Sequence, residues 1–487
     1  MSVEKIEKID IKFVRRSTSA IVVFAIGLRI VAALVWQSQC SSNNTTLRFG
    51  DSHSYWTIAS NLALEGRYQY GSDQSRIFRS PAYPLFLAPL AWGERWFSEQ
   101  SAQAPFVLGA RIAGCILGGL TVWIMMRWTR GMAGTASGIF AGLLAATYCG
   151  AVGMSIFVLS EAVATPLIVL SCWMLWRSTL LDPDQDGSDF WTSQRWLSTA
   201  CSAFALGLAC LARPSWGLWP GLALPLVAFA SNRQVSFFWR NWLLQGMFFF
   251  GILCCVMAPW WVRNYAITGK FVPSTLQVGA SLYDGWHPGA SGSSDENMAF
   301  SIEAMQRILR EEALLANASS EVESTLEWRI DRRLQKEAWT WARENPSDAL
   351  RLGLIKLRKT WSPFPSAREL SNPLVVLWEA GSYLFILVMS ALGLWSLRAD
   401  CRRWTEACWF IAPCVYLALL HMVFVGSVRY RQPGVLILCG LAGIGLSAAW
   451  NRFIVRTPGE TIPRAELSTD RAGNGTDAVG SRASKKS

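Results

Sequence analysis

Five charged residues at the same ends of apolar segments are the side chains best placed to do chemistry. They are two carboxylates and three arginines: Asp51, Glu161, Arg213, Arg263 and Arg429. A carboxylate can take a proton from a hydroxyl group in the transition state. A guanidinium binds a phosphate through two parallel hydrogen bonds and stays charged when it is partly buried. The set therefore suits a reaction that activates a hydroxyl and holds a phosphate.

Each of these residues also has a purely structural interpretation. Asp51 follows Gly50 and would serve as the N-cap of a helix. Glu161 would complement the dipole of the helix that it begins. The arginines would anchor helix ends to headgroups, although arginine is disfavoured on the outer side of a membrane. Ionisable groups in membrane segments are functional candidates, so both interpretations stay open.

The elements that must position these side chains are membrane spans. Of the 487 residues, 52% are hydrophobic, only 16% are charged and 26 are tryptophans. This composition, with a mean hydropathy of +0.25, excludes a soluble enzyme. We expect an all-α polytopic membrane protein with about ten transmembrane helices, in a range of roughly nine to twelve. Two long extracytoplasmic loops would contain interfacial helices.

The spans are predicted at stretches of about 20 apolar residues, the length that crosses about 30 Å of hydrocarbon. The candidates are 18–36, 106–126, 133–153, 158–176, 196–211, 215–230, 241–261, 373–396, 405–425 and 433–450. The short apolar segment 81–90 is expected to be re-entrant or interfacial. Basic residues gather at alternate span ends, which places both termini in the cytoplasm and the two long loops outside.

The chain divides accordingly into five parts. A cytoplasmic tail, 1–17, precedes a transmembrane core, 18–261, that includes the first outer loop, 37–105. An outer helical loop, 262–370, is followed by the last transmembrane helices, 371–453, and a disordered cytoplasmic tail, 454–487. In the outer helical loop we expect helices over 295–315 and 322–344 and a third after Asn345 and Pro346.

That third helix is predicted to lie in the headgroup layer. Its apolar side chains fall on one face, and basic residues surround them: Leu350, Leu354, Leu357 and Trp361, with Arg351, Lys356, Arg358 and Lys359. Lys356 would meet either lipid headgroups or the phosphate of a substrate. The net charge of +11 is assigned to this kind of membrane contact and to topology, and no nucleic-acid partner is expected.

An ordered series of short motifs resembles a known family. The series runs GDSHSYW, NLALEGRYQY, RSPAYPLFLAPL, LSEA, LARPSWGLWP, PWWVRNYAITGKFVP and VRYRQP, and it covers most of residues 20–450. It is similar to the GT-C membrane glycosyltransferases, nearest to the bacterial protein-mannosyltransferase-like and aminoarabinose-transferase-like branch. The resemblance implies a polyprenyl-phosphate-linked sugar as donor. It also implies the bacterial cytoplasmic membrane, with the active site facing the periplasm or exterior.

The resemblance also implies roles for individual residues. Asp51 stands where the family has its catalytic base in the first outer loop, and Glu161 is the second catalytic candidate. The candidate ligands of the donor phosphate are Arg213, Arg263, Arg429 and Lys356. The candidate substrate contacts are Tyr55, His53 and Tyr83. Glu161 would orient the acceptor, hold a divalent cation together with Asp51, or pair with an arginine. Three histidines supply no metal-ligand spacing, so a metal requirement stays open.

The reaction implied is transfer of a sugar to an acceptor hydroxyl with inversion, because a single displacement needs one base and no enzyme nucleophile. The acceptor, whether lipid, protein or glycan, is not indicated. A lipid-linked sugar flippase or transporter is the alternative, and so is a noncatalytic relative that binds lipid-linked sugar. Arg29 lies near the middle of the first span, where an unpaired charge is costly. We expect it to form a structural ion pair, and the alternative is a contact that reaches toward the site.

Overall fold

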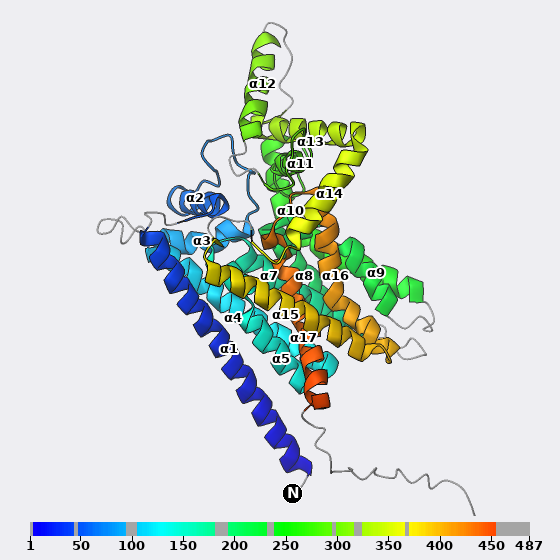
Figure 1. Ribbon diagram of the computed structural model, residues 1–487. Coiled ribbons are helices and arrows are strands. Elements are labelled where there is room, and N and C mark those ends of the chain that lie inside the picture. Colours follow the sequence, from blue (N-terminus) through cyan, green and yellow to red (C-terminus); the bar gives the residue numbers. More distant parts are fainter. Residues whose placement is uncertain are drawn as a thin grey trace, which may run out of the picture. The chain divides into compact units, whose positions relative to one another are not determined.

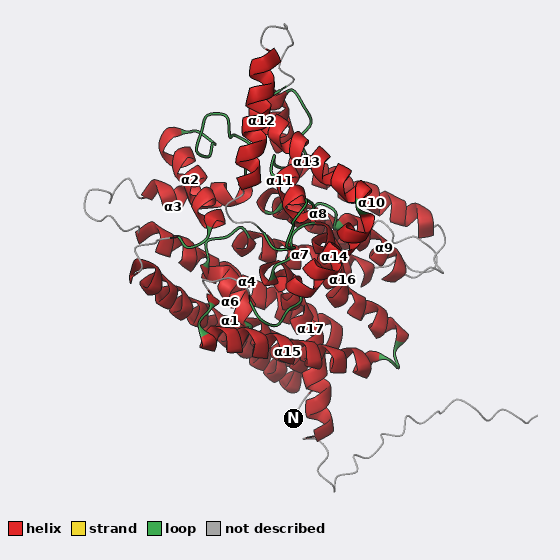
Figure 2. Cartoon of the chain, turned by 45° about the horizontal axis from the view of Figure 1, so that its top comes forward, coloured by secondary structure: helices red, strands yellow, loops and turns green. Residues whose placement is uncertain are grey.

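The computed structural model describes residues 3–42, 47–93, 105–180, 193–230, 238–294, 299–315, 324–365 and 370–453. Every regular element in these ranges is a helix, which confirms the all-α prediction (Figures 1 and 2). The predicted disordered tail, 454–487, lies outside the described residues. The elements are α1 Val3–Ser42, α2 Gly50–Glu65, α3 Ala82–Gly93, α4 Pro105–Ala133, α5 Thr135–Thr147, α6 Cys149–Ile156, α7 Glu161–Leu180, α8 Ser193–Ala212, η2 Pro214–Trp216, α9 Pro220–Ala230, α10 Phe238–Thr268, α11 Val278–Gly285, α12 Ala299–Leu315, α13 Leu326–Glu344, α14 Pro346–Thr360, α15 Pro373–Leu397, α16 Cys401–Val423 and α17 Val428–Phe453.

Eight of the described helices are long and apolar enough to cross a membrane, so the chain is a multi-pass membrane protein. They are α1, α4, α7, α8, α10, α15, α16 and α17. The pair α5 and α6 makes a ninth if it is one span bent by 55°. The one remaining predicted span is 215–230. It holds only part of the short turn η2 and the 11-residue helix α9, which is shorter than a bilayer crossing requires.

Arg29 explains how the bend between α5 and α6 is tolerated inside the bundle. At a helix break the last carbonyl groups lose their partners and must find other donors. The Nη2 and Nη1 atoms of Arg29 donate to the carbonyl oxygens of Ala145 and Ala146, each at 3.0 Å. Its Nε atom donates to Ser155 Oγ at 3.2 Å. The predicted ion pair is therefore wrong, because backbone carbonyls and a hydroxyl take the place of a carboxylate.

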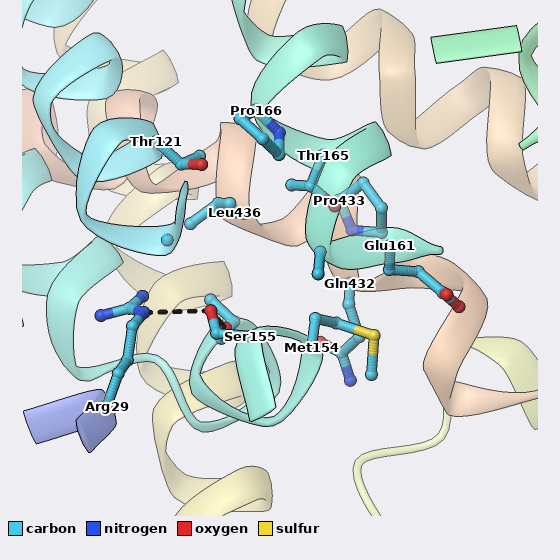
Figure 3. A pocket seen from close by; sticks show the side chains of 13 residues that line it. Arg29, Thr121, Met154, Ser155, Glu161, Thr165, Pro166, Gln432, Pro433 and Leu436 are labelled. Carbon is cyan, nitrogen blue, oxygen red and sulfur yellow. Dashed lines mark hydrogen bonds between the residues drawn. The ribbon is translucent and has the colours of Figure 1, made fainter. Parts of the chain in front are cut away.

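A small cavity of about 20 Å³ lies beside Arg29, between α1, α4, α6, α7 and α17 (Figure 3). This volume holds about one water molecule. Gly118 of α4 makes the approach of α1 possible, because a Cβ atom there would lie 2.6 Å from Arg29 Nε. Glu161 also lines the cavity, but its carboxylate points away from Arg29 (Figure 3). Arg29 thus supports the bundle, and the groups that Glu161 binds lie elsewhere.

The buried core of the bundle is aromatic. Trp128 of α4 packs against Phe410 of α16 with ring centroids 4.7 Å apart, and Trp216 of η2 packs against Tyr416 of α16 at 5.2 Å. Helix α7 packs along α8, and α4 packs against both α5 and α1. Helix α17 joins this core at Gly440, where a Cβ atom would lie 2.3 Å from the Phe410 ring. Close packing of this kind holds α7, η2 and α17 together, and the charged side chains described below are attached to these elements.

The two long loops, 37–105 and 262–370, are folded against the same end of the bundle (Figure 1). In the first, α2 packs on α3, and Gly66 ends α2 with a left-handed φ of 69° that lets the chain turn back. In the second, α12, α13 and α14 occupy the predicted helical segments, whereas α11 was not predicted. Leu350 and Leu354 on α14 are 61% and 55% exposed, which fits the predicted interfacial face.

Candidate active site

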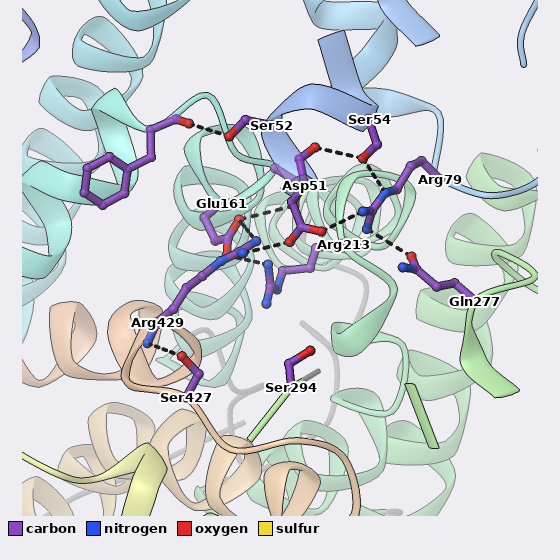
Figure 4. A network of polar contacts seen from close by, with 12 residues as sticks. Asp51, Ser52, Ser54, Arg79, Glu161, Arg213, Gln277, Ser294, Ser427 and Arg429 are labelled. Carbon is purple, nitrogen blue, oxygen red and sulfur yellow. Dashed lines mark hydrogen bonds and ion pairs between the residues drawn. The ribbon is translucent and has the colours of Figure 1, made fainter. Parts of the chain in front are cut away.

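Two carboxylates and three arginines meet where α2, α7 and α17 begin (Figure 4). Asp51 is in the first turn of α2, Glu161 is the first residue of α7, and Arg429 is the second residue of α17. Arg79 comes from the segment before α3, and Arg213 lies between α8 and η2. We call these five residues the charged cluster. Four of them were predicted site residues, and Arg79 was not.

Arg429 joins the two carboxylates. Its Nη1 atom lies 2.7 Å from Asp51 Oδ2. Its Nε atom donates to Glu161 Oε1, and its Nη2 atom lies 3.2 Å from Glu161 Oε2, so the contact with Glu161 is bidentate. The Arg429 side chain is only 21% exposed. The guanidinium therefore lies where a cation shared by the two carboxylates would lie.

Arg79 binds the other face of Asp51 (Figure 4). Its Nη2 atom lies 2.6 Å from Asp51 Oδ1, and its Nε and Nη1 atoms donate to Ser54 Oγ and Gln277 Oε1. Burial alone would raise the pKa of Asp51, but the charges of Arg79 and Arg429 outweigh it and hold that pKa below its usual range. Asp51 is therefore ionised at neutral pH, and its side chain keeps 32% of its surface exposed.

Glu161 holds Arg213 as well as Arg429. Arg213 Nη1 lies 2.6 Å from Glu161 Oε1, and Ser160 Oγ lies 3.3 Å from Oε2. The Glu161 side chain is 1% exposed and that of Arg213 is 14% exposed. Of the three roles expected for Glu161, the structure shows pairing with arginines. Three guanidinium groups and two carboxylates give the charged cluster a net charge of 3 − 2 = +1.

The turn before Glu161 has an unusual backbone. Val158 has a φ of 55°, and it is the only residue other than glycine with a positive φ among the described ranges. A β-branched residue in this region costs about 1–3 kcal/mol, which the surrounding contacts must offset. One such contact is the hydrogen bond of 2.8 Å from Ser52 Oγ to the Phe157 carbonyl oxygen. It ties the turn that leads to Glu161 directly to the helix that carries Asp51.

The predicted substrate contacts are placed around Asp51. Tyr55 is buried beneath the Arg79 guanidinium, 5.0 Å from its ring centre, and packs edge-on against buried Tyr83 at 5.1 Å. His53 is exposed on the same helix. The N-cap interpretation of Asp51 is wrong, because the N-cap of α2 is Phe49 and Asp51 directs its carboxylate to the arginines.

Arg263 and Lys356 contact other parts of the molecule. Arg263 donates to the Arg76 carbonyl oxygen at 3.2 Å and stacks on Trp260. Lys356 is fully buried, and its Nζ atom donates to the Val423 carbonyl oxygen at 2.7 Å, at the end of α16. Burial lowers the pKa of Lys356 to about 8. These hydrogen bonds support loop segments and do not reach the charged cluster.

A signal for Arg79 was present in the sequence. It immediately precedes Ser80 and Pro81, a rigid turn that returns the first long loop to the bundle. An arginine at such a fixed point next to a buried tyrosine was a reasonable partner for the carboxylate.

For a metal, no three His, Cys, Asp or Glu side chains gather within the part of the chain that the structure describes.

Comparison of the sequence with known protein families finds no match, and comparison with curated proteins finds none. Solved structures do match. The archaeal oligosaccharyltransferase AglB from Archaeoglobus fulgidus, in complex with an inhibitory peptide and a dolichol-phosphate, aligns with a TM-score of 0.55 and 12% identity over 90% of this chain and 50% of that chain. The apo form of the Archaeoglobus fulgidus oligosaccharyltransferase aligns with a TM-score of 0.53 and 12% identity over 90% of this chain and 51% of that chain.

A second protein aligns less closely. ArnT from Cupriavidus metallidurans, bound to undecaprenyl phosphate, gives a TM-score of 0.39 and 15% identity over 88% of this chain and 79% of that chain. The chain spans about half the length of the AglB chains that it matches. At 12% identity the likeness to AglB is one of fold alone.

Proposed function

We propose that this protein is a GT-C-type glycosyltransferase that moves a sugar from a polyprenyl-phosphate-linked donor to an acceptor hydroxyl. The observation that carries the proposal is the charged cluster at one end of the membrane helices, in which an ionised Asp51 is held between Arg79 and Arg429, and Arg213 pairs with Glu161. AglB, which has the same fold, was solved with a dolichol-phosphate. The site would face the outer side of the membrane, as the positions of the basic residues favour. The family resemblance implies that this side is the periplasm or exterior of a bacterium.

Asp51 is the general base in this mechanism. It is the more exposed of the two carboxylates, at 32% against 1% for Glu161, so an acceptor can reach it. A carboxylate with a low pKa is too weak a base to ionise an alcohol in the ground state. It takes the proton as the acceptor oxygen bonds to the anomeric carbon and the bond from that carbon to the phosphate oxygen breaks.

Arg213 and Arg429 are proposed to hold the departing phosphate. The electron pair of the broken bond stays on the phosphate oxygen, so the leaving group gains negative charge that nearby guanidinium groups stabilise. The charged cluster has an excess of one positive charge before any ligand binds. Because Arg429 also neutralises Asp51, a contact with phosphate would weaken its pull on Asp51 and make that carboxylate a stronger base.

Glu161 and Arg79 act through these groups. Glu161, buried between Arg213 and Arg429, keeps two like charges in one small space. Arg79 orients the Asp51 carboxylate from the side opposite Arg429. The displacement uses one base and no enzyme nucleophile, so the configuration of the anomeric carbon is inverted.

The test is release of polyprenyl phosphate from a panel of polyprenyl-phosphate sugars by purified protein in liposomes, with a cell-envelope extract of lipids, glycans and proteins added to supply the acceptor hydroxyl. Asp51→Asn keeps the shape of the side chain and removes the base, and we expect release to fall by about a hundredfold or more. Asp73→Asn is the matched control, because Asp73 is an exposed carboxylate in the same loop. Equal release by wild type and Asp51→Asn contradicts the proposal. Movement of intact donor lipid across the bilayer without cleavage indicates a flippase instead.

A further inference from the structure

A partly buried carboxylate outside the charged cluster ties the two long loops together. Glu327 lies in the first turn of α13, in the second long loop. Its Oε2 atom accepts hydrogen bonds from the backbone N–H groups of Arg76 and Ile77, at 3.0 and 3.1 Å. These residues belong to the first long loop, two or three positions before Arg79.

Other contacts from the same side hold this segment. The Leu276 N–H donates to the Ile77 carbonyl oxygen at 3.0 Å, and Ile77 is fully buried against Trp260 and Leu276. Arg263 donates to the Arg76 carbonyl oxygen. Glu327 accepts from two neighbouring N–H groups, of which that of Arg76 is exposed and that of buried Ile77 is partly buried. A polar group that loses its partner is costly where water cannot replace it, so the cost falls mainly on the Ile77 N–H group.

The segment ends at Arg79, whose guanidinium bonds Asp51 and Gln277. We propose that Glu327 is a positioning residue, which from the second long loop holds the Ser75–Arg79 segment in the conformation that brings Arg79 to Asp51. The idea deepens the proposed function, because it makes the geometry of the general base depend on α13. Through Glu327 and Arg79, the second long loop would then influence the reaction at Asp51.

The geometry does not require Glu327 to be ionised. Both N–H groups share Oε2, and Oε1 lies 3.5 Å from Ser75 Oγ. A neutral carboxyl group can accept both N–H groups with Oε2 and place its proton toward the serine. Burial raises the pKa of Glu327 to about 7, against the hydrogen bonds that favour the charged form. The charged and titratable groups around it are Arg263 of α10, Tyr68 of the first long loop and Asp331 of α13.

The sign of the pH effect follows from the raised pKa. A carboxyl group that binds its proton more tightly in the closed arrangement stabilises that arrangement below its unperturbed pKa. This stabilisation is lost as the pH rises through about 7. The Ser75–Arg79 segment should therefore open more readily at pH 8 than at pH 5. Glutamine has the shape of the neutral acid, with an oxygen for the two N–H groups and an amide for Ser75, so Glu327→Gln should remove the pH dependence.

Hydrogen exchange of the peptide that spans residues 67–79 tests the proposal in purified, full-length protein. After correction for intrinsic rates, we expect Glu327→Ala to speed exchange at Arg76 and Ile77 by about tenfold or more. Glu327→Gln should stay within about threefold of wild type at pH 5 and show no further change to pH 8. Glu344→Gln, an exposed carboxylate on the same helix, is the control and should match wild type. Wild-type exchange in Glu327→Ala overturns the proposal, and so does a Glu327→Gln variant that opens as much as Glu327→Ala.

The catalytic arm is separate. In the donor-release assay, Glu327→Ala should lower kcat by about tenfold with a smaller change in the donor KM, because Arg79 acts on the base rather than on donor binding. Glu327→Gln should restore kcat. A wild-type protein that releases no polyprenyl phosphate would contradict the proposed function and leave the exchange result to decide the role of Glu327.

Discussion

Replacing Arg429 with glutamine is the most informative single change in the charged cluster. Arg429 makes three charge-assisted hydrogen bonds, two to Glu161 and one to Asp51. Its loss leaves neither carboxylate alone, because Arg213 still pairs with Glu161 and Arg79 still pairs with Asp51. The free energy of unfolding should therefore fall by about 2–3 kcal/mol, less than the 3–5 kcal/mol typical when a buried ion loses its last partner.

Glu161→Gln should cost more, although it also removes one charge. It leaves three arginines with the single carboxylate of Asp51, and the net charge of the charged cluster rises from +1 to +2. Arg213, which is 14% exposed, then has no carboxylate partner within the cluster. We expect a loss of about 3–5 kcal/mol. The double variant should lose about 1–2 kcal/mol less than the sum of the two single changes, because the Arg429–Glu161 pair is counted in both.

The assay is denaturant unfolding of detergent-solubilised protein, followed by tryptophan fluorescence, for wild type, both single variants and the double variant. Arg403→Gln is a control, because its ion pair with Asp400 is exposed on both sides, at 58% and 52%, and such pairs contribute about 0–1 kcal/mol. Additive effects of the two single changes, within about 0.5 kcal/mol, would refute the bridging role of Arg429. A smaller loss for Glu161→Gln than for Arg429→Gln would refute the assigned balance of charge.

Three further predictions concern single residues. Arg79→Gln should lower donor turnover by about ten- to a hundredfold, and Arg79→Lys should lower it by less, because only the orientation and charge of Asp51 depend on Arg79. Equal turnover in wild type and in both variants contradicts this prediction. Because the pKa of Asp51 is held below its usual range, the base stays ionised until the pH falls well below 4. The Glu327→Gln protein lacks the titration of Glu327, so its kcat/KM should show no acid limb between pH 5 and 8. An acid limb in that range assigns the base elsewhere. Arg29→Leu should lower the free energy of unfolding by about 2–4 kcal/mol, because two buried carbonyl groups lose their donor, and unchanged unfolding curves would show that the bend does not need Arg29.

The sequence predicted at which depth in the membrane the charged residues lie better than it predicted which of them are in contact. Apolar length located the spans, and the positions of Asp51, Glu161, Arg213 and Arg429 at their ends placed these residues in one layer. Arg263 also lies at the end of a predicted span, but it contacts the first long loop and not the charged cluster. Residues in one layer can meet or lie far apart, and the order of helices around the bundle decides which. That order comes from side-chain packing, which hydropathy does not report.

The misses have local causes. Arg29 was expected to find a carboxylate, but the break between α5 and α6 exposes carbonyl groups that serve as well, and a break of this kind has no strong sequence signal. Segment 215–230 has the composition of a span, but its helix begins only at Pro220. Arg79 was overlooked because its neighbours signalled a turn. The role of Glu327 depends on two backbone N–H groups 250 and 251 residues away along the chain.

Arg429 lies 378 residues after Asp51 and 268 residues after Glu161, and it enters the membrane with α17. During synthesis the two carboxylates are therefore in place long before the residue that joins them. Until α17 is inserted, Asp51 and Glu161 have separate arginine partners and no common one. The site is completed when α17 is inserted, so a chain that stalls or is cut before α17 has both acids but no charged cluster. Assembly of the protein thus ensures that only chains that extend through α17 have a complete site.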